Sequence, residues 1–265
     1  MPIQNRHVPA TVAVAMLLCA AGCGVRDATA PGVPAPKTEA ASTGYAFPNI
    51  SKRRPAPAGS GDIDRAETAA ANQPDNSAAQ RQLGIAYYST AGYKAATNVL
   101  ETAVRLDPAD GAAWLYLGYS RMGAGQPEKA LEAFDTAAKA NLTNTDKAAA
   151  KAESGTIRYQ ALRDDKGAME DFKAALALNP KEGTAALALG TNAAEGQDAA
   201  AARRYFELAA QALPAGPDRA SVFACLGRLA EESKDKPKAH SWYAKALADD
   251  KANAWAKVRF PLTAP

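Results

Sequence analysis

Side chains that commonly do chemistry are scarce in this 265-residue sequence. It contains two histidines, His7 and His240, and three cysteines, and it has no phosphate-binding loop of the G-x-x-x-x-G-K-[ST] type. Adjacent carboxylates such as Glu231 and Glu232 point around a helix and not toward a shared proton. With one histidine beyond the N-terminal segment, no histidine-based triad or Cys/His metal site can be assembled. We therefore expect no enzymatic activity, no metal and no cofactor.

One cysteine, Cys23, is placed for a specific reaction. It ends the run Cys19-Ala-Ala-Gly-Cys23, which resembles a bacterial lipobox, in which small residues precede a cysteine that is diacylated and becomes the new N-terminus. Ala20 stands where leucine is commonest in that motif. Upstream, a short basic start precedes an apolar run, residues 8–21, that is shorter than the roughly 20 residues a membrane span needs. These features predict a lipoprotein signal peptide over residues 1–22 and lipidation of Cys23. The alternative is a plain secretory signal with a coincidental cysteine.

The residue after Cys23 bears on the membrane that would hold the protein. It is Gly24, and not the aspartate that retains lipoproteins at the inner membrane in enteric-type sorting. The resemblance to a lipobox therefore implies attachment to the outer membrane, on its periplasmic face. Because several acyl chains together anchor a protein stably, the expected attachment needs no transmembrane helix.

Residues 23–61 have the composition of a linker. Alanine, proline, glycine, serine and threonine dominate, and no periodic apolar face is present, so we expect a lipidated N-terminus followed by a disordered segment. The basic cluster at residues 52–54 is interpreted as solvated, with contact to anionic lipid as the alternative. The whole chain has a net charge of +3 with basic and acidic residues interspersed, so no nucleic-acid partner is expected.

A pattern of about 34 residues begins at Ser77 and occurs five times. Its first copy places small, apolar and aromatic residues at Leu83-Gly84, Tyr87, Ala96 and Leu100, and it ends with Pro108. The copies cover residues 77–110, 111–144, 149–182, 183–216 and 220–253. In the third copy Thr156 falls on the small-residue position and Gly155 lies one residue early, so its first helix departs from the pattern.

This spacing resembles the tetratricopeptide repeat (TPR), a helix-turn-helix unit whose small residues let two helices approach closely. The resemblance implies an all-α fold, a TPR α-solenoid of about five repeats over residues 62–260. No repeat can bury its apolar face alone, so stacking and terminal caps are required. Residues 62–74 match the second half of a repeat and are expected to cap one end. A helix that begins at Asn253 and stops before Pro261 is expected to cap the other, leaving residues 261–265 as a tail.

The resemblance also implies a binding surface. In the TPR family the first helix of each repeat lines a concave groove, and a peptide or helix of a protein partner binds there. The apolar residues at groove positions, which are the predicted partner-binding residues, are Ile85, Tyr88, Leu115, Tyr119, Met122, Ile157 and Leu187. The alternative is that some of them pack internally. Chaperone-binding members use an asparagine where Ile85 and Tyr119 stand, so a terminal carboxylate is not the expected ligand.

A lipidated signal followed by such repeats resembles pilotins and the tight-adherence (Flp) pilus assembly lipoproteins. The resemblance implies a non-enzymatic, membrane-anchored adaptor that assists assembly of a pilus, secretion or other envelope complex. A different class remains open, a scaffold that recruits enzymes of cell-wall or polysaccharide assembly. A third is an accessory domain of an enzyme whose site is completed by another chain.

Overall fold

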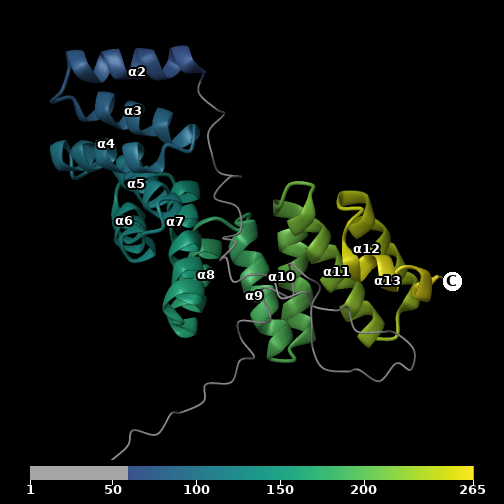
Figure 1. Ribbon diagram of the computed structural model, residues 1–265. Helices are drawn as coiled ribbons and strands as arrows, with labels where there is room; N and C mark the ends of the chain where they lie inside the picture. The colour runs from purple at the N-terminus through teal and green to yellow at the C-terminus, as the bar shows by residue number, and fades with distance from the viewer. Residues whose placement is uncertain (1–58, 265) are drawn as a thin grey trace, which may run out of the picture. The chain divides into compact units, whose positions relative to one another are not determined.

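The computed structural model describes residues 59–264, and every regular element in that part of the chain is helical (Figure 1). This confirms the all-α prediction. The predicted signal peptide, Cys23 and all but the last residues of the predicted linker lie outside the described residues. The described chain falls into two compact units, residues 59–179 and residues 180–264, and each is described by itself.

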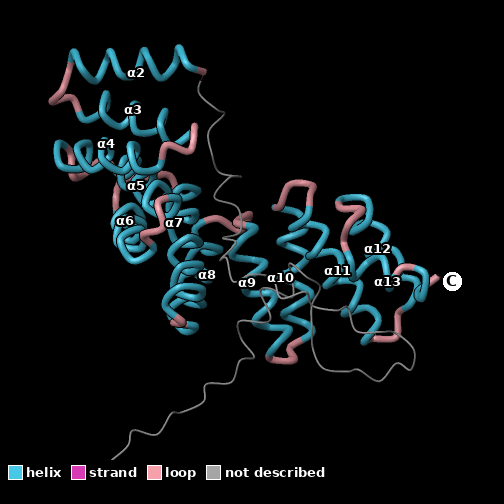
Figure 2. Tube along the Cα trace, in the orientation of Figure 1, coloured by secondary structure: helices cyan, strands magenta, loops and turns pink. Residues whose placement is uncertain are grey.

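The first unit contains a single helix followed by three helical pairs. The single helix is α2 (Ser60–Asn72), which begins inside the predicted linker and occupies the predicted half-repeat. The pairs are α3 (Ser77–Ser89) with α4 (Tyr93–Leu106), α5 (Gly111–Gly123) with α6 (Pro127–Lys139), and α7 (Asn144–Ile157) with α8 (Asp165–Leu178). Short loops join consecutive helices, as Figure 2 shows.

The second unit contains two helical pairs and a short terminal helix. The pairs are α9 (Gly183–Glu195) with α10 (Ala199–Ala212), and α11 (Pro217–Glu232) with α12 (Lys236–Asp249). The terminal helix α13 (Ala254–Arg259) is followed by a 3₁₀ turn, Pro261–Thr263, within the predicted tail. No helix within residues 59–264 has both the length and the apolar character required to cross a bilayer.

Glycines set the distance between the two helices of a pair. A Cβ atom added at Gly118 would lie 2.6 Å from a ring carbon of Phe134, and one added at Gly190 would lie 2.7 Å from a ring carbon of Phe206. Both rings are buried, so neither has free space to move into. The small residues therefore permit the close helix approach that the sequence pattern predicts.

The third repeat contains one extra residue, and a π-helical turn takes it up. The glycine that packs against an aromatic ring is Gly155, whose added Cβ would lie 2.9 Å from Phe172. This pair is separated by 17 positions, whereas Gly118 and Phe134 are separated by 16. Helix α7 continues into a π-helical turn, Arg158–Leu162, which carries more residues per turn than an α-helix. The placement of Thr156 at the small-residue position was therefore wrong.

The turn inside each repeat has a common geometry. One residue per turn adopts a left-handed conformation, and these residues are Ala91, Gly125, Arg163, Gln197 and Lys234. The following amide donates back into the first helix, as in a Schellman cap: the N–H of Gln126 bonds to the carbonyl of Arg121, five residues earlier. In the third repeat the N–H of Asp164 bonds to Arg158, six residues earlier. The extra residue therefore lies between Gly155 and this turn.

The start of α7 accounts for the longer connection between the second and third repeats. The hydroxyl of Thr143 accepts a hydrogen bond from the N–H of Asp146 at 3.1 Å, so α7 begins at Asn144, five residues before the predicted repeat boundary at 149. The extra residues form an added helical turn, as the sequence predicted.

A cluster of charges joins α6, α7 and α8. Arg158 donates to Asp171 and to Asp135, both at 2.7 Å, and Lys151 donates to Asp171 at 2.8 Å. Ser154 donates to Asp135 at 3.0 Å. Burial lowers the pKa of Arg158, but the hydrogen bond and charge of Asp171, with the charge of Asp135, outweigh it and raise that pKa. Ser154 directly precedes the packed glycine, a position where the other four repeats have a leucine, namely Leu83, Leu117, Leu189 and Leu226. A hydrogen bond to a carboxylate therefore replaces an apolar contact in this repeat.

Candidate partner-binding groove

The predicted groove residues lie on the first helices of four repeats. Ile85 and Tyr88 are on α3, Ile157 ends α7, and Leu187 is on α9 in the second unit. The remaining three, Leu115, Tyr119 and Met122, are on α5. Helices α3 and α5 contact each other, so the residues of these two helices belong to neighbouring surfaces of the first unit. A side-chain cap starts each helix: Asn76 accepts from the N–H of Ala79, and Asp110 accepts from the N–H of Ala113.

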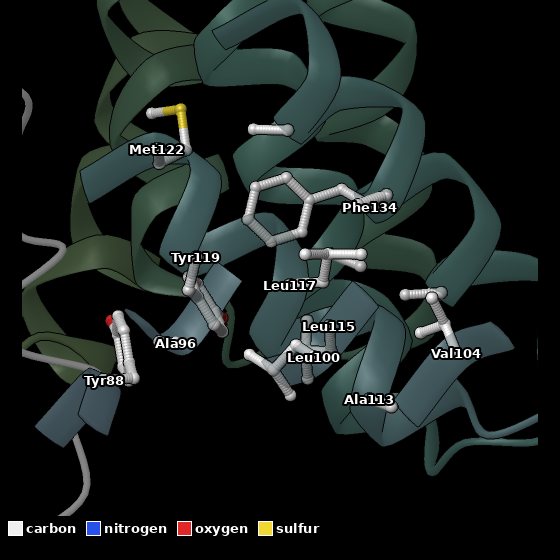
Figure 3. Packing of buried hydrophobic residues seen from close by; sticks show 14 of the residues in the cluster. Tyr88, Ala96, Leu100, Val104, Ala113, Leu115, Leu117, Tyr119, Met122 and Phe134 are labelled. Carbon is white, nitrogen blue, oxygen red and sulfur yellow. The ribbon is translucent and has the colours of Figure 1, made fainter. Parts of the chain in front are cut away.

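Five of the seven predicted residues are buried in one apolar cluster, of which Figure 3 shows a part. They are Tyr88, Leu115, Tyr119, Met122 and Ile157. Their burial agrees with the alternative that part of the apolar set packs internally. Ile85 and Leu187 are partly exposed. Contact of a partner with any of the seven stays a prediction.

Aromatic rings are concentrated where α3 and α5 meet. The Tyr88 ring stacks on Tyr119 with centroids 5.9 Å apart, and Tyr119 meets Phe134 edge-on at 5.1 Å. Tyr116 lies 5.9 Å from Tyr88, and Tyr93 lies 5.8 Å from Tyr88. We call these five residues the tyrosine cluster. Offset and edge-on pairs of this kind stabilise a surface beyond the area that they bury.

Sequence reasoning found two of these rings as groove residues and missed Tyr93 and Tyr116, which are both partly exposed. The groove positions follow a fixed spacing along the first helices, and Tyr116 lies between two of them, three residues before Tyr119. Tyr93 begins a second helix, where that spacing selects no residue. Its ring fills the space beside Gly123, where an added Cβ would lie 2.5 Å away.

Charged groups border the aromatic rings. Arg81 on α3 forms an ion pair of 2.5 Å with Asp110, which caps α5. Burial, and then the negative charge of Asp146, raise the pKa of Tyr116 above its ordinary value. Tyr87 donates a hydrogen bond of 2.6 Å to Glu67 on α2, and this bond is the main cause of its raised pKa. With their pKa values raised, Tyr87 and Tyr116 are neutral near pH 7, and the hydroxyl proton of Tyr87 is already donated to Glu67.

Comparison with known families and structures agrees with the repeat pattern. The tetratricopeptide-repeat family matches residues 81–145 and 117–183. Together these two matches span residues 81–183, the part of the chain that is similar to tetratricopeptide repeats. The TPR fold is a typical non-enzymatic protein-interaction scaffold, and its stacked first helices provide an extended concave surface. A search of curated protein sequences found no match.

Solved structures show the same fold. The chain is similar to the pilF protein of Pseudomonas aeruginosa, with 18% identity and a TM-score of 0.65, over 75% of this chain and 89% of that one. It is similar to PilW, described as a widely conserved type IV pilus biogenesis factor, with 17% identity and a TM-score of 0.57, over 75% and 90%. The chain is also similar to a chain of the APC/C Cut9–Hcn1 hetero-tetramer, with 21% identity and a TM-score of 0.56. The match covers 77% of this chain but only 40% of that one. The chain therefore has a TPR-like solenoid architecture.

Proposed function

We propose that this protein is a membrane-anchored adaptor whose TPR surface binds a peptide or helix of a partner and assists assembly of a pilus, secretion or other envelope complex. The observation that supports the proposal most is the likeness to PilW and to pilF, which extends over about nine-tenths of each of those chains. A lipobox-like Cys23 ahead of the repeats adds independent support for an anchor.

The proposed contact surface is the part of the first unit around Ile85. Ile85 is a groove position on α3 that is still partly exposed, one helical turn after the ion-paired Arg81. The rings of Tyr88 and Tyr119 are close along the same pair of helices and make the surface rigid. A surface supported by buried, packed rings loses little conformational entropy when it binds, which suits it to hold a short apolar segment.

Site-specific photo-crosslinking in cells tests the adaptor role. A photoreactive residue at position 85 should form an adduct with a component of a pilus, secretion or envelope complex. The matched control is position 94, because Lys94 is exposed on the second helix, α4, of the same repeat. Adducts from position 94 with none from position 85 would place the binding surface elsewhere and overturn the groove assignment.

Fractionation tests the anchor separately. Cys23→Ser should move the protein from the membrane fraction to the soluble fraction and leave its helix content unchanged, because the acyl chains provide the attachment. A variant that stays with the membrane after a salt wash would contradict the proposed lipidation, while the crosslinking result would still stand.

A further inference from the structure

The end of the second unit exposes apolar side chains on a basic surface. Within residues 59–264 three large apolar side chains are at least 40% exposed, and two of them, Val258 and Leu262, lie here, at 49% and 56%. Lys257 and Pro261 are exposed beside them. The opposite side of α13 is packed: Ala256 is fully buried in the apolar cluster of the last repeat. We call Lys257, Val258, Pro261 and Leu262 the terminal face.

The charge of this end is strongly positive. Residues 234–265 contain seven lysines and arginines and three aspartates, a net charge of +4, whereas the whole chain has +3. One of the seven, Arg259, is paired with Glu231 of α11 at 3.9 Å. The three aspartates are already engaged within the fold. Asp249 accepts two hydrogen bonds from Arg219 at 2.6 and 2.8 Å, Asp235 caps α12, and Asp250 accepts from the N–H of Ala252 at 2.8 Å.

The lysines of this end have no such internal partners. Among the described residues no carboxylate lies within 4 Å of Lys251 or Lys257. The amines of Lys234, Lys236 and Lys238 likewise face solvent around the turn into α12. Lys245 lies over the Trp242 ring at 4.2 Å, a contact that leaves its charge uncompensated. The surface therefore has a surplus of positive charge available to an outside anion.

We propose that the terminal face docks on the surface of a bilayer that contains anionic phospholipid. Val258 and Leu262 enter the headgroup region, and Lys257 with the other exposed lysines of this end contacts phosphate groups. Apolar side chains bordered by lysine and arginine are the combination that holds a helix in a membrane interface, since burial and charge attraction add together. Trp255 and Arg259, whose guanidinium lies 4.9 Å from the Trp255 ring, are on the same short helix. Tryptophan and arginine are both favourable at the headgroup level.

Other occupants fit the charge less well. A second copy of the same face would bring two positively charged chain ends together, each with a net charge of +4 over residues 234–265, and like charges oppose that contact. An acidic protein surface matches the charge but not the two isolated aliphatic side chains. The inference does not depend on the proposed adaptor function or on lipidation of Cys23, because it uses only residues of the second unit.

Hydrogen exchange of the full chain with vesicles tests the proposal, because the readout is local and an attachment elsewhere in the chain does not affect it. Peptides covering residues 254–263 should gain protection with vesicles of phosphatidylcholine and phosphatidylglycerol, and not with phosphatidylcholine alone. Added salt should reverse the protection. Lys257→Gln should raise the half-saturating lipid concentration about fivefold, since one lysine near an anionic surface contributes about that factor.

A double variant and a matched control identify the apolar contribution. Val258→Ser with Leu262→Ser should raise the half-saturating lipid concentration more than about tenfold. Leu162→Ser removes an exposed leucine of the third repeat, which is 40% exposed, and should leave the concentration unchanged. Equal protection with neutral vesicles, or an equal effect of Leu162→Ser, would overturn the proposal. So would protection of residues 254–263 by an acidic protein with none by anionic vesicles.

Discussion

Gly155→Ala is the substitution that tests the register of the third repeat. In the structure the new methyl group would lie 2.9 and 3.0 Å from two ring carbons of Phe172 and 3.1 Å from the carbonyl oxygen of Ala168. The last contact is to the backbone of α8, so it cannot be relieved by rotating a side chain. Overpacking of this kind costs about 1–3 kcal/mol, and the better helix propensity of alanine returns about 1 kcal/mol. The expected net loss in unfolding free energy is about 1 kcal/mol.

The neighbouring position provides the comparison. Thr156 donates a hydrogen bond of 2.9 Å to the carbonyl of Ala152, so the bonding partner of its hydroxyl lies in its own helix. Thr156→Ala loses a buried methyl group but gains helix propensity, and the net change should be about 0.5 kcal/mol or less. If Thr156 occupied the close-approach position instead, Gly155→Ala would be stabilising by about 1 kcal/mol, because only propensity would change.

Urea unfolding followed by far-UV circular dichroism measures both variants. The structure predicts a lower midpoint for Gly155→Ala than for Thr156→Ala, with Gly118→Ala, whose methyl would lie 2.6 Å from Phe134, as the positive control. A Gly155→Ala protein that is as stable as the unmodified chain, or more stable, would refute the π-turn account of the third repeat.

Two further predictions concern the last repeat. Lys234 has a φ of 60°, so Lys234→Gly should raise the unfolding free energy by about 0.5–1 kcal/mol, measured as a higher melting temperature. Lys245→Gly, in the interior of α12, should lower it instead. Tyr243 is fully buried, and burial, together with its hydrogen bond of 2.6 Å to Glu231, holds its pKa well above the ordinary value of about 10. The folded protein then retains a proton that the unfolded chain releases, so stability should fall above about pH 10, by up to about 1.4 kcal/mol per pH unit. Tyr243→Phe should remove that part of the slope, and urea midpoints at rising pH measure it; an unchanged slope would contradict the assignment.

The repeat frame could be predicted because it depends on residues whose type is constrained by packing. Gly118 and Gly190 accept only a hydrogen in place of a side chain, and Phe134 and Phe206 fill the space opposite them, so their spacing is visible in the sequence. The third repeat broke the frame by one residue. The residue types around Arg158 do not distinguish a π-helical turn from a shifted α-helix. The packing of Gly155 against Phe172 in three dimensions decides which of the two conformations forms.

The sequence predicts which helix positions belong to the groove, but it does not predict which side chains there are exposed. Fixed spacing selected the residues on the first helices, but spacing does not tell whether a tyrosine such as Tyr88 is covered by Tyr93 from the following helix. The ends of helices were displaced for a similar reason: Thr143 caps α7 five residues early, and Pro217 starts α11 three residues before the predicted boundary at 220. A capping side chain, as at Thr143, and a proline at the first helical position, as at Pro217, are local features that a 34-residue pattern does not contain.

The ionic cluster of the third repeat has a consequence for the order in which similar repeats assemble. Helices that share a leucine–glycine pair and an aromatic partner can exchange places during folding at little energetic cost, and repeat proteins misassemble in this way. Helix α7 differs, because Arg158 and Lys151 need Asp135 on one side and Asp171 on the other. A mispaired α7 would leave these carboxylates without their cations. The side chain of Asp171 is only 10% exposed, and separating a buried charge pair is strongly unfavourable. The ion pairs thus disfavour incorrect pairing of α7 and distinguish the third repeat from its neighbours while the chain folds.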